Sequence, residues 1–262
     1  MEQEGGGGDL SKSAAVAACT AMAVFYVAIL YSPTLILRLP PPDSFKSFMI
    51  RRFVCAGISS IVSLFVCFLI LPIKMWNASI LLGVYGIRLD HIWQALALPF
   101  LLTSLMYSGS FILKLLSMLN GGQDLSVAPV TEELVFRACM IPLLLCGGFS
   151  TYTVIFLSPI FFSLAHLNHL MELCLQKKCS LLKACQVVGF QLGYTVIFGA
   201  YASFLLVRTG HLAAPLVAHI FCNFMGLPVI FSRRDSKCGV CNWDVEFFVD
   251  AFPIVEPAFV QR

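Results

Sequence analysis

Charged residues are scarce in this chain, and their scarcity excludes most soluble proteins. Only 12% of the 262 residues are Asp, Glu, Lys or Arg, whereas 59% are hydrophobic, and the mean hydropathy is +0.88. A soluble domain carries about a quarter charged residues, so an ordinary soluble enzyme is excluded. The hydrophobicity also excludes a disordered chain, and the glycines and prolines show no collagen-like period. The net charge of +3 is small and gives no indication of nucleic-acid binding.

Long runs without a charged residue predict that the chain crosses a membrane. About 20 apolar residues, rising about 1.5 Å each, cross a hydrocarbon core of about 30 Å. The uncharged runs are residues 13–37, 53–73, 92–113, 138–165, 184–207 and 212–232. The run 138–165 is long enough for two helices separated at Gly147-Gly148, and residues 75–87 could form a re-entrant or partly inserted segment. The predicted fold is therefore all-α, a polytopic membrane bundle of about seven to eight transmembrane helices.

The few charges predict how the chain lies in the membrane. Four basic residues follow the first run, namely Arg38, Lys46, Arg51 and Arg52, while the segment before that run is net negative. The positive-inside rule therefore places the loop after the first run in the cytoplasm. The acidic start and the length of the first run argue against a cleavable signal peptide, so this run is expected to remain as a membrane helix.

The same distribution divides the chain into three parts. We expect a polar N-terminal tail at residues 1–12, a membrane-embedded helical domain at 13–232 and a polar C-terminal tail at 233–262. Most of the eleven cysteines lie in or beside apolar runs, where they behave as small hydrophobic residues. Cys238 and Cys241 have metal-ligand spacing but lack a second pair, so they are not expected to be functional.

Polar residues inside the apolar runs are the candidates for function. An ionisable group near the middle of a membrane helix costs about 2.5 to 3.5 kcal/mol on insertion scales, so each one needs an explanation. Three clusters stand out: Thr131-Glu132-Glu133-Leu-Val-Phe-Arg137, Phe162-Ser-Leu-Ala-His166 and His219-Ile-Phe-Cys-Asn223.

The first cluster is expected to open a helix. Pro129 lies in the approach, and Thr131 is a suitable N-cap because its hydroxyl can accept an unpaired backbone N–H. Glu132 and Glu133 would then lie in the first turn, where the helix dipole favours an ionised carboxylate. Glu133 and Arg137 have the spacing of a same-face ion pair, while Glu132 points about 100° away. In the alternative interpretation, Arg137 merely neutralises one of two acids at a helix start.

The other two clusters supply imidazole and amide groups. His166 follows Phe162 by four residues, so the phenyl ring would share its face and shield it from water. His169 lies where the helix leaves the apolar zone and is expected to be structural or interfacial. His219 and Asn223 are four apart and should project from one face, and because unpaired buried polar groups are costly, their partners must come from other helices.

These side chains have the composition of a water-activating hydrolase. Glu132 could take a proton from water, helped or oriented by His166. His219 and Asn223 could then donate hydrogen bonds to the oxyanion that forms on the attacked carbonyl. Glu, His and His could instead ligate zinc and leave a fourth position for water, although no His-Glu-x-x-His motif is present. Both mechanisms stay open at this point.

The motifs together resemble a known family. Glu132-Glu133-x-x-x-Arg137, Phe162-x-x-x-His166 and His219-x-x-x-Asn223, in this order on separate membrane helices, are similar to the type II CAAX prenyl endopeptidases, the Ras-converting CAAX protease group. The flanking residues resemble the eukaryotic branch, and the N-terminal third is similar to plant members.

The resemblance implies an all-helical intramembrane glutamate protease of the endoplasmic reticulum, multi-pass and without metal or other cofactor. It implies removal of the last three residues of farnesylated or geranylgeranylated Cys-a-a-X proteins, with Ras- and Rho-type GTPases as substrates and partners. Carried over position by position, Glu132 activates water with His166, and His219 with Asn223 stabilises the oxyanion. Glu133 and Arg137 orient the others.

The resemblance is expected to run from about residue 14 to about residue 231. The family normally has a further hydrophobic segment after the last motif, whereas here Ser232-Arg-Arg-Asp-Ser-Lys237 leads into an acidic tail, which suggests an alternative or truncated C-terminus. Buried polar residues on several helices also fit a small transporter or a non-catalytic membrane scaffold. No internal repeat of the kind found in transporters is present.

Overall fold

The computed structural model describes residues 10–40, 42–71, 78–107, 128–167, 170, 174 and 181–225. Within these residues every regular element is a helix, which confirms the predicted all-α fold. His169, the cysteine pair Cys238 and Cys241, and nearly all of the two predicted tails lie outside the described residues.

The helices agree closely with the uncharged runs of the sequence. In chain order they are α1 (Lys12–Leu35), α2 (Phe45–Ile70), α3 (Ala78–Val84), α4 (Ile92–Met106), α6 (Ala128–Glu133), the π-helix η1 (Leu134–Cys139), α7 (Met140–Cys146), α8 (Thr151–Ala165), α10 (Leu181–Thr209) and α11 (Ala213–Met225). Among the described helices, α1, α2 and α10 are long and apolar enough to cross a membrane, and α4, α8 and α11 are shorter apolar helices. The total of seven to eight spans stays a prediction.

Local sequence accounts for the helix ends. The side chain of Ser11 accepts the N–H of Ala14 at the start of α1, and Ser44 accepts the N–H of Ser47 at the start of α2. The predicted break at Gly147-Gly148 is confirmed, because α7 ends just before it and α8 starts just after it. Gly148 has φ +79°, a left-handed conformation that only glycine adopts without strain.

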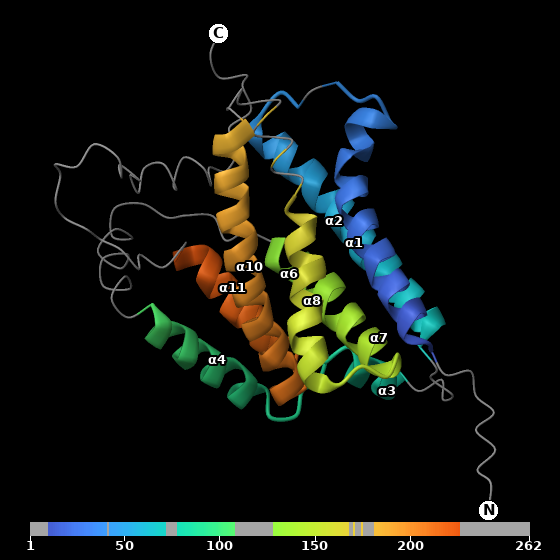
Figure 1. Ribbon diagram of the computed structural model, residues 1–262, viewed down its shortest axis with the longest axis vertical. Helices are drawn as coiled ribbons and strands as arrows, with labels where there is room; N and C mark the ends of the chain where they lie inside the picture. Colours follow the sequence, from blue (N-terminus) through green and yellow to red (C-terminus); the bar gives the residue numbers. More distant parts are fainter. Residues whose placement is uncertain are drawn as a thin grey trace, which may run out of the picture.

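Residues 128–139, which form α6 and η1, lie at the centre of the bundle. They pack against α1, α2, α8, α10 and α11, and Figure 1 shows α6 between the α1–α2 pair and α10 with α11. Phe136 and Arg137 are among the largest fully buried side chains of the protein. The first polar cluster of the sequence therefore lies in the interior of the bundle.

One end of the bundle gathers the basic loop and the second polar cluster. Figure 1 shows that α1 ends, α2 begins, α8 ends and α10 begins at this end. His166 caps the C-terminus of α8 there. Because the loop between α1 and α2 carries the basic residues, the positive-inside rule predicts that this end faces the cytoplasm, and we refer to it as the cytoplasmic end.

Candidate functional site

The helix that carries the two glutamates begins earlier than expected. Thr131 lies inside α6, which includes Ala128 and Pro129, so the prediction that Thr131 is the N-cap is wrong. Proline fits the first turn because its missing N–H would have no helical partner there. The Thr131 hydroxyl donates to the Ala128 carbonyl (3.0 Å) and also lies 3.1 Å from the Tyr26 hydroxyl. Glu132 and Glu133 are therefore beyond the first turn, where the helix dipole has weaker influence.

A π-helix follows directly after Glu133. Its wider turn changes the backbone hydrogen-bond pattern, and such turns often occur at functional sites. Side chains of neighbouring helices bond to its carbonyls: the Ser158 hydroxyl donates to the Phe136 carbonyl (3.1 Å), and the Cys67 thiol donates to the Cys139 carbonyl (3.4 Å). These contacts hold η1 against α8 and α2 and fix the direction in which its side chains point.

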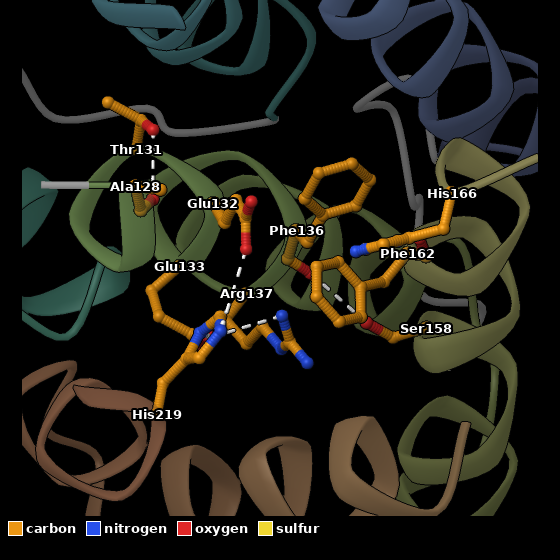
Figure 2. Close-up of polar contacts among 10 residues, drawn as sticks. All are labelled: Ala128, Thr131, Glu132, Glu133, Phe136, Arg137, Ser158, Phe162, His166 and His219. Atoms are coloured by element: carbon orange, nitrogen blue, oxygen red, sulfur yellow. Dashed lines mark hydrogen bonds and ion pairs between the residues drawn. The ribbon is translucent and has the colours of Figure 1, made fainter. Parts of the chain in front are cut away.

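His219 of α11 lies between the two glutamates. Its Nδ1 is 2.7 Å from Oε1 of Glu133, and its Nε2 is 3.5 Å from Oε2 of Glu132. The imidazole is buried. The prediction that the partners of His219 come from another helix is thus confirmed. Although adjacent residues of a helix point about 100° apart, both glutamates reach the same ring, one at each nitrogen (Figure 2).

Glu133 also forms the predicted ion pair with Arg137. Oε1 of Glu133 is 3.1 Å from Nη1 of Arg137, and both side chains are fully buried. The guanidinium lies over the ring of Phe162, 4.3 Å from its centroid, in a cation–π arrangement. Gly199 of α10 provides the necessary space, because a Cβ there would lie 3.2 Å from Nη2 of Arg137 and 2.8 Å from Cβ of Pro159.

Phe162 connects the clusters. Besides Arg137, its ring makes edge contacts with Phe136 (5.2 Å between centroids), His166 (4.7 Å) and His219 (6.1 Å). The predicted sharing of a face by Phe162 and His166 is confirmed, and Nδ1 of His166 lies 2.9 Å from the Phe162 carbonyl. Figure 2 shows His166 reaching from the end of α8 towards the side on which Glu132 lies.

Burial differs sharply among the predicted site residues. Asn223 is exposed, whereas His219, one turn earlier on α11, is buried. Within the described part of the chain, no hydrogen bond joins the Asn223 amide to the cluster. The side chain of Glu132 is 20% exposed and that of Glu133 only 1%. The expectation that all these groups are fully interior is therefore wrong for Asn223.

Sequence reasoning missed Tyr26. This residue of α1 places its hydroxyl against Thr131 and its ring edge-on to Phe136, at 5.4 Å between centroids. It lies in an uncharged run, where a tyrosine hydroxyl needs a partner, and this was the available signal. Among the described residues, no three His, Cys, Asp or Glu side chains are placed to hold one metal ion.

The chain is similar to proteins named CAAX prenyl protease 2. The relative from Arabidopsis thaliana is 52% identical over 96% of this chain and 92% of its own length. The relative from Homo sapiens is 32% identical over 82% of this chain and 71% of its own length. The relative from Caenorhabditis elegans is 34% identical over 72% of this chain and 74% of its own length. No solved structure matches the chain.

The plant relative corrects one expectation. Residues 1–231 are only about 88% of the 262 positions, so a match over 96% of the chain extends into the acidic tail. The prediction that the likeness stops near residue 231 is therefore wrong for this relative.

The family model described as "Type II CAAX prenyl endopeptidase Rce1-like" matches residues 114–225. This range contains every residue of the cluster around His219 described above, together with His166 and Asn223. With the plant and animal relatives, it shows that the chain belongs to the type II CAAX prenyl endopeptidase family.

Proposed function

We propose that this chain is an intramembrane endopeptidase that removes the C-terminal aaX tripeptide from farnesylated or geranylgeranylated CAAX proteins. The names of its relatives support a CAAX protease. The observation that carries the mechanism is the unequal exposure of two adjacent glutamates on one imidazole, because this gives one accessible carboxylate beside a buried, pre-oriented ring.

Glu132 is the proposed general base. Water attacks the carbonyl carbon of the prenylated cysteine and forms a C–O bond, while the water proton passes to Glu132. The carbonyl electron pair moves onto the oxygen. When this intermediate collapses, the C–N bond breaks and the proton passes to the amine of the leaving tripeptide. The partial exposure of Glu132 supports this assignment, since a base must meet water and substrate.

His166 is the proposed partner of Glu132 in positioning the water. Its Nδ1 contact with the Phe162 carbonyl and its edge contact with the Phe162 ring fix the imidazole at the end of α8. With Nδ1 held in this way, Nε2 is the nitrogen proposed to contact the water during the reaction.

His219 and Asn223 are the proposed oxyanion donors. The two contacts of His219 differ: Nδ1 is held at 2.7 Å by Glu133, whereas Nε2 meets Glu132 only at 3.5 Å, the outer limit of a hydrogen bond. In its imidazolium form the ring would donate at both nitrogens. The two positive charges of the imidazolium and the Arg137 guanidinium would then balance the two glutamate carboxylates. Nε2–H can then turn from Glu132 to the developing oxyanion.

Glu133 and Arg137 are proposed to orient His219 rather than to react. A carboxylate at Nδ1 fixes the tautomer and the plane of an imidazole. Arg137 in turn neutralises the buried carboxylate of Glu133.

The scheme requires no metal, and we expect activity to survive a strong chelator such as 1,10-phenanthroline in the membrane preparation. Loss of activity that returns on adding zinc would instead support the zinc mechanism. For substrates we propose Ras- and Rho-type GTPases at the endoplasmic reticulum membrane. Each prenyl CH₂ that enters lipid contributes about 0.8 kcal/mol, so the peptide bond is delivered at the membrane surface.

The proposal is tested by release of a tripeptide from a farnesylated CAAX peptide by membranes that contain this chain. Glu132→Ala should abolish release, while an unprenylated peptide should remain uncut by the unaltered protein. An active Glu132→Ala protein would contradict the mechanism, and no release by the unaltered protein would contradict the function.

A further inference from the structure

A buried stripe on α2 passes the site, and the same helix face continues towards the cytoplasmic end. Ala56, Ser60, Ser63 and Cys67 are buried at spacings of three and four residues, so they form one face of the helix. Ser60 belongs to the site wall, because its hydroxyl contacts the Thr131 carbonyl at 3.3 Å. Arg52 continues this stripe by one further turn towards the cytoplasmic end.

Arg52 places a cation on this face of α2. Its side chain is half-buried, and its guanidinium lies 5.5 Å from the centroid of the Phe48 ring. Arg52 stands about two turns from Ser60, whose hydroxyl contacts the carbonyl of Thr131, the residue before Glu132. A cation thus lies on the face of α2 that contacts the chain beside Glu132, nearer the cytoplasmic end.

The neighbouring arginine is differently engaged. Arg51 is rotated by about 100° from Arg52 on the helix, and its Nη1 donates to the Pro40 carbonyl at 2.7 Å. Arg51 therefore anchors the loop between α1 and α2, while Arg52 lies on the helix face that it shares with Ala56 and Ser60.

The separation along α2 fits the length of the leaving peptide. Ser60 and Arg52 are eight positions apart, which is about 12 Å of helix at about 1.5 Å per residue. Three extended residues span at most about 10 to 11 Å. If the scissile bond lies beside Glu132, the C-terminal carboxylate of the tripeptide falls within reach of an arginine side chain at position 52.

We propose that Arg52 binds the C-terminal α-carboxylate of the substrate, an inference that rests on the function proposed above. The planar guanidinium matches a carboxylate with two parallel hydrogen bonds. This contact sets the distance between the chain end and the cleaved bond, so that three residues are removed, and it selects substrates with a free carboxyl terminus.

The test compares a farnesylated CAAX peptide with the same peptide carrying a C-terminal amide. Hydrogen bonds to a charged group are worth about 1.5 to 3 kcal/mol, so the unaltered protein should cleave the acid with a kcat/KM about 10- to 100-fold above the amide, mainly through KM. Arg52→Gln should lower the ratio of kcat/KM for the acid to that for the amide to about one, and unchanged thermal unfolding in detergent would show that the variant is folded. Arg52→Lys should recover part of the preference, and the matched control Arg51→Gln should keep all of it.

Equal cleavage of acid and amide by the unaltered protein would overturn the proposal. An equal loss of both substrates in Arg52→Gln would also overturn it, because the arginine would then support the cytoplasmic end or its contact with anionic lipid rather than the carboxylate. Failure of the unaltered protein to cleave either peptide would refute the proposed function, and the role of Arg52 would fall with it.

Discussion

Glu132 and Glu133 are adjacent in the chain and contact the same imidazole, yet their surroundings are opposite. Glu133 lies on what we call the sealed side, with Arg137 and Phe162, and its carboxylate has almost no exposure. Glu132 lies on what we call the open side, towards which His166 reaches, and it is partly exposed. Two identical side chains therefore differ in their access to water: one carboxylate is buried and the other is partly exposed.

From this difference in burial we infer that the two carboxylates have different roles, one in positioning His219 and one in the reaction. Removing one partner of a buried ion pair costs about 3 to 5 kcal/mol, so Glu133 is bound to Arg137 and has little freedom to exchange a proton. Glu132 is partly exposed, so its carboxylate is accessible to water. The sealed side therefore holds His219 in place, and the open side is where we expect the reaction.

The largest difference is expected from replacing each glutamate in turn. Glu132→Gln should reduce kcat by about 10²- to 10⁴-fold, because a positioned general base typically contributes this much, and should leave thermal stability in detergent unchanged. Glu133→Gln should lower both activity and stability, since Arg137 would remain buried without its carboxylate. Peptide-release assays and thermal unfolding of the purified proteins measure the two effects. Similar profiles for the two variants would remove the distinction between the sides.

The second prediction concerns the cation of the sealed side. Arg137→Leu leaves the buried Glu133 carboxylate without its guanidinium partner and should lower the free energy of unfolding by about 3 to 5 kcal/mol. The double variant Glu133→Leu/Arg137→Leu should recover much of this loss, because both charges of the buried pair are then removed together, although it should stay inactive. A double-mutant cycle on purified protein measures the coupling.

The exposed pair of Arg88 and Asp90 is the control for this prediction. These side chains form two hydrogen bonds, at 2.7 and 2.9 Å, but they are about half exposed. Arg88→Leu should therefore have no measurable effect on stability, as is usual for ion pairs in water. A loss equal to that of Arg137→Leu would mean that burial does not account for the strength of the sealed side.

A third prediction uses two glycines of α10. A Cβ at Gly199 would lie 2.8 Å from Cβ of Pro159 and would press on Arg137, so Gly199→Ala should cost about 1 to 3 kcal/mol of stability by overpacking the sealed side. Nothing lies within 4 Å of a Cβ at Gly193, so Gly193→Ala should instead stabilise the helix by up to about 1 kcal/mol. Thermal unfolding of the pair should show shifts of opposite sign, and shifts of the same sign would contradict the close packing around Arg137.

Spacing along single helices was predictable from the sequence, because it depends only on the helical period. The pairs Glu133 with Arg137 and Phe162 with His166 follow directly from a separation of four residues. The break at Gly147-Gly148 was also predictable from the length of the uncharged run and the two glycines.

Features that depend on packing between helices were not predictable in this way. The π-helix after Glu133 relies on hydroxyl and thiol donors from α8 and α2, which no local pattern identifies. For the same reason the sequence did not indicate that both glutamates reach His219, or that Asn223 stands exposed while His219 is buried.

The smallest effect is predicted for a substitution of Tyr26. The Tyr26 hydroxyl contacts Thr131, immediately before the two glutamates, while its ring packs edge-on against Phe136. Tyr26→Phe keeps the ring and removes one hydrogen bond, so it should lower stability by about 0.5 to 1.5 kcal/mol. Because Thr131 keeps its bond to the Ala128 carbonyl, α6 should stay in place and kcat should change less than in any glutamate variant. A decrease in kcat comparable to that of Glu132→Gln, with stability unchanged, would mean that Tyr26 belongs to the open side and takes part in the reaction.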